Sequence, residues 1–126
     1  MAERNTLQIT PFMHVAEIEP AVRFFVDVLG FKALVQNPGY AYVEREGAGI
    51  RIQAHDEPNE LAAHGGFAYY LDVRDLGAVI EELGPRLAEL PAGHVHGPVD
   101  QGYGQRELLI RAPDGNLVVF GQAIGD

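Results

Sequence analysis

An internal repeat restricts the folds open to this chain more than any other feature of its sequence. When the first half is shifted by 58 residues, Phe12 meets Tyr70 and Glu17 meets Asp75. The further pairs that place apolar on apolar residues are Val15 with Val73, Ile18 with Leu76, Ala21 with Val79, Val22 with Ile80 and Phe25 with Leu83. Such self-similarity predicts two copies of one structural unit within the chain.

Each half has the same predicted order of elements. Alternating apolar residues predict a strand, apolar residues three and four apart predict a helix, and turn residues separate three further strands. In the first half the expected ranges are 7–15 for the strand, 17–29 for the helix, and about 32–37, 40–45 and 49–55 for the last strands. In the second half they are 66–73, 75–91, 94–100, 105–111 and 117–122, after a polar loop at 56–65. Both halves are therefore predicted to be βαβββ units.

Two βαβββ units predict an α+β fold with a cleft. Their strands can form one curved, mostly antiparallel sheet, with the helices outside and a concave cleft inside. A cleft lined by strands from both halves is a natural site for a small molecule. We expect a single domain over 1–126, with pseudo-repeats at about 7–55 and 66–122.

Composition and charge exclude several classes of function. The net charge of −9 repels phosphate backbones and anionic lipids, so neither nucleic acid nor a membrane is an expected partner. The chain contains no cysteine, which excludes thiolate metal sites and a cysteine nucleophile. It also contains no serine, which excludes a serine nucleophile. The first residues form no apolar signal region, so we expect a cytoplasmic protein.

Two sequence segments resemble a known superfamily. The first is HVAEIEPAVRFFVDVLGF and the second is YGQRELLIRAPDGNLVVFG. Together with the tandem βαβββ units, they resemble the vicinal oxygen chelate proteins, which include glyoxalase I, extradiol dioxygenases and bleomycin resistance proteins. Tyr103 stands where the superfamily usually has tryptophan, and Ala112 where it has aspartate. The resemblance covers about residues 7–122 and implies the fold described above.

The same resemblance implies where a catalytic metal would be held. The superfamily's ligand positions correspond here to Thr10, Ala68 and Val119, with a fourth near Arg51 or Gln53. None of these side chains is a good ligand for a catalytic divalent ion. The resemblance therefore favours the metal-free branch of bleomycin resistance proteins, which bind an antibiotic and confer resistance. It implies no metal, no cofactor, no catalytic residue and a homodimer.

Alternation along the strands predicts which side chains line the cleft. The expected ligand-binding residues are Thr10, Phe12, His14, Tyr40, Tyr42, Ala68, Tyr70, Tyr103 and Val119. This aromatic lining is suited to a flat heteroaromatic ligand held by stacking. Three alternatives stay open: Phe12 and Tyr70 fill a closed core, Tyr103 packs against a dimer partner, or Tyr40 and Tyr42 lie at a solvent edge.

Five histidines leave a metal-dependent alternative open. His94 and His96 are two residues apart on a predicted strand, and we expect them at the surface, with His55 and His64 exposed around the 56–65 loop. His14 is expected to hydrogen-bond at the end of the cleft. The rival hypothesis is a glyoxalase-like lyase or dioxygenase with an atypical ligand set, for example His14 with Glu17, His94 or His96. A third is a silent accessory domain that contacts another protein.

Overall fold

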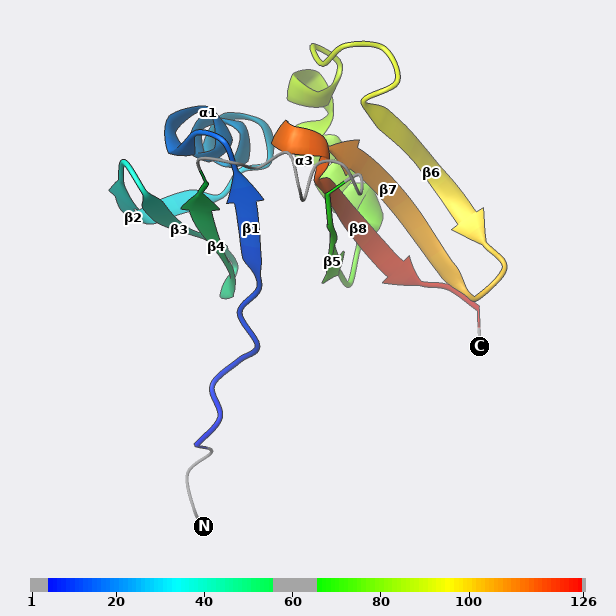
Figure 1. The fold of residues 1–126 in the computed structure, drawn as a ribbon. Helices are drawn as coiled ribbons and strands as arrows, with labels where there is room; N and C mark the ends of the chain where they lie inside the picture. The colour runs from blue at the N-terminus through cyan, green and yellow to red at the C-terminus, as the bar shows by residue number, and fades with distance from the viewer. Residues whose placement is uncertain (1–4, 56–65, 126) are drawn as a thin grey trace.

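The computed structural model describes residues 5–55 and 66–125, which form two βαβββ modules (Figure 1). The predicted loop at 56–65, with His64, lies outside the described residues. The first module comprises β1 (Phe12–Val15), α1 (Ile18–Arg23), a π-helical turn η1 (Phe24–Val28), β2 (Lys32–Asn37), β3 (Tyr40–Arg45) and β4 (Ala48–Ala54). The second comprises β5 (Ala68–Asp72), α3 (Leu76–Leu87), β6 (Val95–Gln101), β7 (Gln105–Arg111), a 3₁₀ turn η2 (Pro113–Gly115) and β8 (Leu117–Ala123).

The strands form two sheets with the same topology. Their orders are β1-β4-β3-β2 and β5-β8-β7-β6, with one parallel pair in each sheet and antiparallel pairing otherwise. The α+β class and the tandem βαβββ units are therefore confirmed. The single curved sheet expected from the sequence is instead two four-stranded sheets, whose edge strands β1 and β5 face each other. The Tyr69 phenol reaches from β5 to the Phe12 carbonyl of β1 at 2.8 Å, so a side chain links these edges.

The first helix has the apolar face that the sequence predicted. Its residues Ile18, Ala21, Val22, Phe25 and Leu29 are all buried against the first sheet. The helix begins at Ile18 and widens into a π-helical turn, in which the Leu29 amide donates to the Phe24 carbonyl at 3.3 Å. Gly30 then adopts a φ of +74°, which ends the helix.

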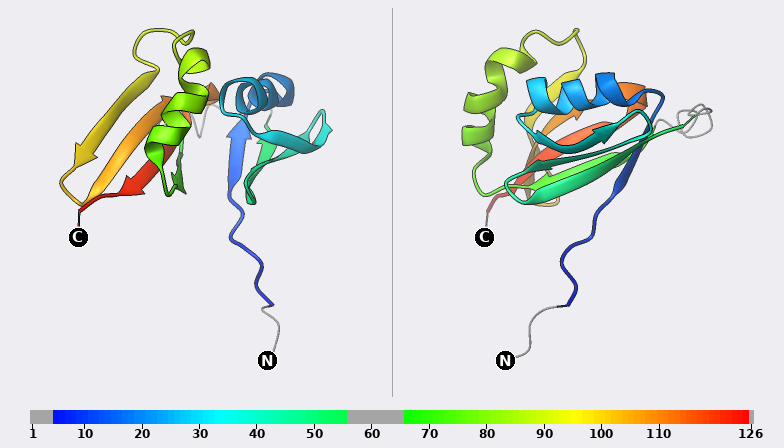
Figure 2. Two further views of the ribbon diagram at one scale, coloured as in Figure 1. Left: turned by 180° about the vertical axis from the view of Figure 1, so that it is seen from behind. Right: turned by 90° about the vertical axis from the view of Figure 1, so that its left-hand side faces the viewer.

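The second helix is capped and shorter than predicted. The Asp75 carboxylate accepts a hydrogen bond from the Ala78 amide at 3.1 Å, which satisfies one free amide of the first turn. The helix ends at Leu87 and not near Pro91, two residues after Pro85. Figure 2 shows that each helix covers its own sheet and that the two helices run across each other, with α3 contacting η1. Among residues 5–55 and 66–125, no helix is long and apolar enough to cross a membrane.

The first strand is much shorter than the predicted range of 7–15. Only residues 12–15 form β1, and an extended arm precedes it, directed away from the two modules (Figure 1). Pro11 has no amide to donate, and only its carbonyl bonds to β4, through the Arg51 amide at 3.0 Å. Leu7 and Ile9 are 77% and 93% exposed. The other strands match their predicted ranges to within two residues at each end.

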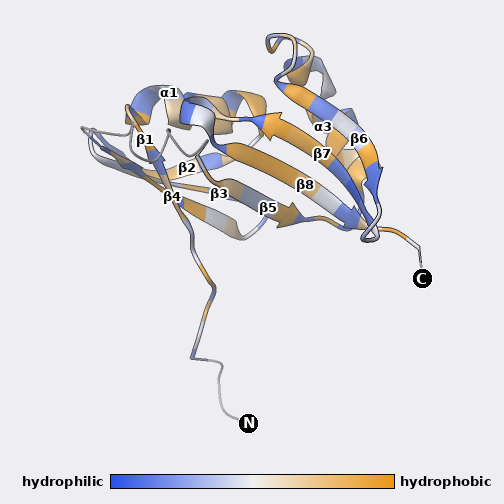
Figure 3. Ribbon diagram, turned by 45° about the vertical axis from the view of Figure 1, so that its right-hand side comes forward, coloured by the Kyte–Doolittle hydropathy of each residue, from blue (hydrophilic) through white to orange (hydrophobic). Residues whose placement is uncertain are grey.

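The buried core lies between the helices and one face of each sheet. On β1 the buried residues are Met13 and Val15, and on β8 they include Val118 and Phe120. In Figure 3 hydrophobic residues run along β7 and β8 of the second sheet. Because side chains alternate along a strand, the neighbours of these core residues point to the opposite face, where the cleft is expected.

An ion pair joins the two modules on the helical side. The Arg45 guanidinium of β3 donates to both carboxylate oxygens of Glu82 on α3, at 2.8 and 2.7 Å, and to the Leu29 carbonyl at 3.2 Å. Hydrogen bonding with Arg45 lowers the pKa of Glu82. The guanidinium also lies 5.9 Å from the centre of the Phe120 ring. A bidentate pair of this kind fixes the distance between the modules.

We predict that Glu82→Gln destabilises the protein by about 1 kcal/mol, because the acceptor loses its negative charge and one of the two oxygens that Arg45 bonds. Urea unfolding at pH 7 measures this change. The control is Glu81→Gln, an exposed neighbour on the same helix, which should unfold at the wild-type midpoint. Equal midpoints for both variants and the wild type would contradict a structural role of the ion pair.

Candidate ligand-binding cleft

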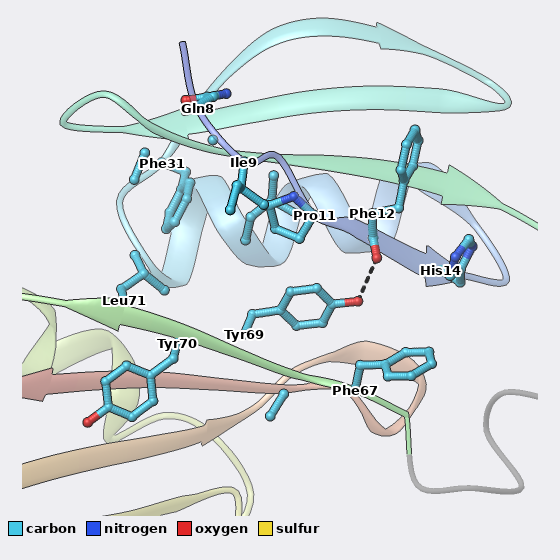
Figure 4. Close-up of a pocket in the computed structure, with 14 residues that line it drawn as sticks. Gln8, Ile9, Pro11, Phe12, His14, Phe31, Phe67, Tyr69, Tyr70 and Leu71 are labelled. Atoms are coloured by element: carbon cyan, nitrogen blue, oxygen red, sulfur yellow. Dashed lines mark hydrogen bonds between the residues drawn. The ribbon is translucent and has the colours of Figure 1, made fainter. Parts of the chain in front are cut away.

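A cavity of about 680 Å³ lies along the seam between β1 and β5 (Figure 4). This volume is within the range of small-molecule sites, which is about 300–1,000 Å³. Most of its lining is apolar or aromatic. The lining residues are Gln8, Ile9, Pro11, Phe12, His14, Phe31, Ala48, Gly49, Ile50, Phe67, Ala68, Tyr69, Tyr70 and Leu71.

Four of the predicted site residues line this cavity, namely Phe12, His14, Ala68 and Tyr70. Phe12 is 46% exposed and Tyr70 is 43% exposed. Half-exposed rings are not packed as core residues, so the alternative in which Phe12 and Tyr70 fill a closed core is wrong. Alternation along β1 and β5 puts these side chains on the face away from the helices, because the buried apolar residues of each strand occupy the face under the helices.

Tyr69 is the most important lining residue that the sequence did not reveal. Its hydroxyl donates to the Phe12 carbonyl across the seam, and burial raises the pKa of Tyr69 to about 12. Alternation assigns Tyr69 to the core face, opposite to Tyr70, so no local pattern marks it as a site residue. It reaches the cavity because β5 is an edge strand. The other lining residues that were missed are Ile9, Pro11, Phe31, Ala48, Gly49, Ile50, Phe67 and Leu71, whereas alternation along the first strand also puts the lining residue Gln8 on the cleft face.

Tyr103 lies outside the cavity lining and is anchored to a buried carboxylate. Its ring is 68% exposed, while its hydroxyl donates to Glu107 Oε2 at 2.7 Å. The Gln101 amide donates to Glu107 Oε1 at 3.2 Å. Burial raises the pKa of Glu107, but hydrogen bonding, first of all from Tyr103, outweighs it and holds that pKa below its ordinary value. Glu107 therefore remains a carboxylate that positions Tyr103.

Tyr70 connects this carboxylate to the cavity. Its hydroxyl donates to Gln105 Oε1 at 3.0 Å, and desolvation together with the Glu107 carboxylate raises the pKa of Tyr70 to about 12. The ring lies so close to Gly121 of β8 that a side chain at that position would collide with the hydroxyl. Val119, the register partner of Tyr70, is buried on β8. The predicted residues Tyr70, Tyr103 and Val119 thus lie together on the second sheet.

The predicted residues of the first sheet form a second polar and aromatic group. Arg51 donates to the Tyr40 hydroxyl at 2.6 Å and lies 5.7 Å from the centre of the Tyr42 ring. Gln8 donates to the Tyr42 hydroxyl at 3.1 Å and to Thr10 Oγ1 at 2.7 Å. Tyr40, Tyr42 and Thr10 do not line the cavity, but Gln8 does, so this group borders one end of the cleft.

The histidines are arranged differently from the sequence prediction. His14 Nδ1 lies 2.5 Å from His55 Nε2, and His55 is half-buried where exposure was expected. Burial, with a smaller contribution from His55, lowers the pKa of His14. His94 precedes β6 and is half-buried, while His96 is exposed within it. In the described part of the chain, no three His, Asp, Glu or Cys side chains group to hold a metal, so the atypical set of His14 with Glu17, His94 or His96 does not assemble.

The model of the Glyoxalase/Bleomycin resistance protein/Dioxygenase superfamily matches residues 8–120. The chain belongs to this superfamily. The bleomycin resistance protein of Geobacillus stearothermophilus is 27% identical over an alignment of 129 positions, which covers 94% of this chain and 98% of that protein.

Solved structures of the superfamily share the fold. The bleomycin-binding protein of Streptomyces verticillus, in complex with copper(II)-bleomycin, has a TM-score of 0.77 and 24% identity, and the match covers 98% of this chain and 100% of that one. Lactoylglutathione lyase from Agrobacterium tumefaciens has a TM-score of 0.67 and 21% identity, covering 91% and 92% of the two chains. Because binding proteins and a lyase share this fold, the fold does not decide the function.

We predict that Glu107→Gln destabilises the protein by about 1–2 kcal/mol at pH 7, because its charge-assisted bonds become neutral ones. The folded-state pKa of Glu107 is lowered, so its carboxylate stabilises the fold above the ordinary value of 4.5 and loses that effect as the pH falls below it. Denaturant unfolding between pH 7 and pH 3 should show the difference between wild type and variant shrinking below pH 4.5. A difference that stays constant down to pH 3 would contradict the assignment.

Proposed function

We propose that the protein binds and sequesters an aromatic or heteroaromatic small molecule, such as a bleomycin-type antibiotic. The observation that carries this proposal is the half-exposed pair of rings, Phe12 and Tyr70, on facing strands of one apolar cavity. Two rings exposed in a cleft of the free protein offer stacking surfaces that need no rearrangement. Phe67 is 51% exposed and adds a third ring to the same lining.

Polar groups of both sheets lie next to lining residues, since Gln8 bonds to Tyr42 and Tyr70 bonds to Gln105. Arg51, with Tyr40 and Tyr42, lies on the first sheet, and Glu107, with Tyr103, lies on the second. A ligand with an extended heteroaromatic body and polar substituents is complementary to such a cleft, since stacking supplies affinity and hydrogen bonds fix orientation.

The residues at the superfamily's metal positions support binding over catalysis. Thr10, Ala68 and Val119 supply no imidazole or carboxylate there, and the first structural neighbours and curated relatives are named for bleomycin binding and resistance. We therefore assign no catalytic residue and no cofactor to the cleft.

We also propose that the protein acts in the cytoplasm as a homodimer in which the extended arm binds the second copy. The arm exposes Leu7 and Ile9, 77% and 93% accessible, beside the apolar cavity lining, and apolar side chains exposed together in this way mark an interaction surface. Ile9 also lines the cavity, so an arm held by a partner would complete the wall of the cleft.

Calorimetric titration with metal-free bleomycin tests the binding function. We expect saturable binding by the wild type, weakened by about 1–3 kcal/mol in Phe12→Ala through loss of a stacking ring. Leu34→Ala removes an equally exposed apolar side chain of β2 outside the cavity and should bind as the wild type does. Absence of heat with bleomycin and with other aromatic antibiotics would contradict the proposal.

Two variants distinguish stacking by the Tyr103 ring from the hydrogen bond of its hydroxyl. Tyr103→Phe keeps the ring and removes the bond to Glu107, whereas Tyr103→Ala removes both. If the ring stacks on the ligand, Tyr103→Ala should weaken binding and Tyr103→Phe should not. Normal binding by Tyr103→Ala, combined with a lower melting temperature, would make Tyr103 a packing residue.

Introducing a negative charge on the extended arm tests whether the arm forms the dimer contact. Ile9→Glu should shift the mass measured by light scattering from dimer towards monomer, because a carboxylate is costly to bury in an apolar contact. Thr6→Glu, at an exposed position of the same arm, should remain dimeric. A wild-type protein that is monomeric at micromolar concentration would contradict this part of the proposal.

A further inference from the structure

Two histidines at neighbouring strand ends form a contact that the aromatic lining of the cleft does not explain. His14 is the third residue of β1, and His55 directly follows β4. The two strands pair in parallel, with His14 opposite Gln53, and the His55 amide donates to the Val15 carbonyl at 2.9 Å. The sheet therefore fixes both backbones side by side.

Each of the two imidazole rings turns one nitrogen towards the other ring. His14 Nδ1 and His55 Nε2 are 2.5 Å apart, and the ring centres are 4.4 Å apart with an angle of 61° between the planes. Both residues are half-buried. A single proton can lie between these nitrogens, so at least one of them offers a lone pair. Figure 4 shows His14 at the end of the cavity opposite to Phe31.

This geometry is close to that of two ligands on one metal ion. Zinc–imidazole bonds are about 2.0–2.1 Å long, so two nitrogens bound to one tetrahedral or tetragonal centre are about 2.9–3.4 Å apart. The pair has to open by less than about 1 Å to admit an ion. Side-chain rotation of His55, which lies beyond the last residue of β4, provides that movement.

We propose that His14 and His55 together bind a borderline divalent cation such as Cu²⁺, Ni²⁺ or Zn²⁺ at this end of the cleft. Imidazole nitrogen is a preferred donor for these ions. The ion replaces the proton between the rings, and that proton passes to solvent. The described chain supplies these two ligands, and water or donor atoms of a molecule in the cleft complete the coordination.

The site is separate from the metal positions of the superfamily. Those positions hold Thr10, Ala68 and Val119, and His14 lies four residues beyond Thr10 along the chain. A carboxylate that the structure ties to this strand end is that of Asp114, whose Oδ2 accepts the Ala16 amide at 2.9 Å. The Asn116 amide donates to the His14 carbonyl at 3.1 Å, which holds the strand end in place. The inference does not rest on the proposed antibiotic binding.

Titration of untagged protein with Cu²⁺ alone tests the site. We expect one equivalent to bind, with electron paramagnetic resonance couplings from two imidazole nitrogens. His14→Gln and His55→Gln should each weaken copper binding at least tenfold and leave one or no such coupling. The matched control is the double variant His94→Ala/His96→Ala, which removes two histidines near β6 and should bind copper as the wild type does.

The outcomes separate this site from other copper-binding groups. Loss of copper binding in the His94→Ala/His96→Ala protein, or unchanged binding in both glutamine variants, would overturn the proposal. The wild-type spectrum decides the question even if a variant fails to fold, because copper without two imidazole nitrogens contradicts the site directly. Because the probe is the metal ion alone, failure here leaves the titration with metal-free bleomycin unaffected.

Discussion

The cleft depends on how the two modules are joined at β1 and β5. Edge strands that met through backbone hydrogen bonds would form one continuous sheet and leave no cavity between them. Here a side chain joins them, because the Tyr69 hydroxyl of β5 bonds to the Phe12 carbonyl of β1. Two further side-chain contacts join the modules elsewhere: the Asn116 amide bonds to the His14 carbonyl, and Arg45 bonds to Glu82. A phenol ring spaces the strands further apart than a backbone ladder does. The cavity of about 680 Å³ lies along this seam.

The same arrangement explains why aromatic residues are exposed in the cleft. Core residues such as Met13 and Phe120 occupy the helix-covered faces of the sheets, so the alternate positions, Phe12 and Tyr70, must point away from the core. Buried polar groups then fix the rings: Glu107 accepts the Tyr103 hydroxyl, and Tyr70 lies over Gly121. In the first module Tyr42 of β3 lies over Gly49 of β4 in a similar way, although the repeat counterpart of Tyr70 is Phe12. Alternation along the strands of both modules therefore sets both the core and the exposed rings.

The sequence predicts the repeated unit well and the seam poorly. The order of elements, the apolar face of the first helix and the inward positions Phe12, His14 and Tyr70 follow from local periodicity, which is strong in this chain. Tyr69 and the pairing of His14 with His55 depend on which strands become neighbours, and no local pattern contains that information. Alternating apolar residues at 7–11 predict a strand. In the described structure this segment is not part of β1, which begins at Phe12. Periodicity in the sequence does not predict which segments find a partner strand, because that pairing depends on the tertiary structure.

The most direct test of this account is the structure of the protein crystallised with metal-free bleomycin. The account predicts heteroaromatic rings of the ligand stacked on Phe12 and Tyr70 at the seam, with the bond from Tyr69 to the Phe12 carbonyl intact. A ligand bound away from this seam, or β1 and β5 joined by backbone hydrogen bonds with the cavity closed, would contradict it.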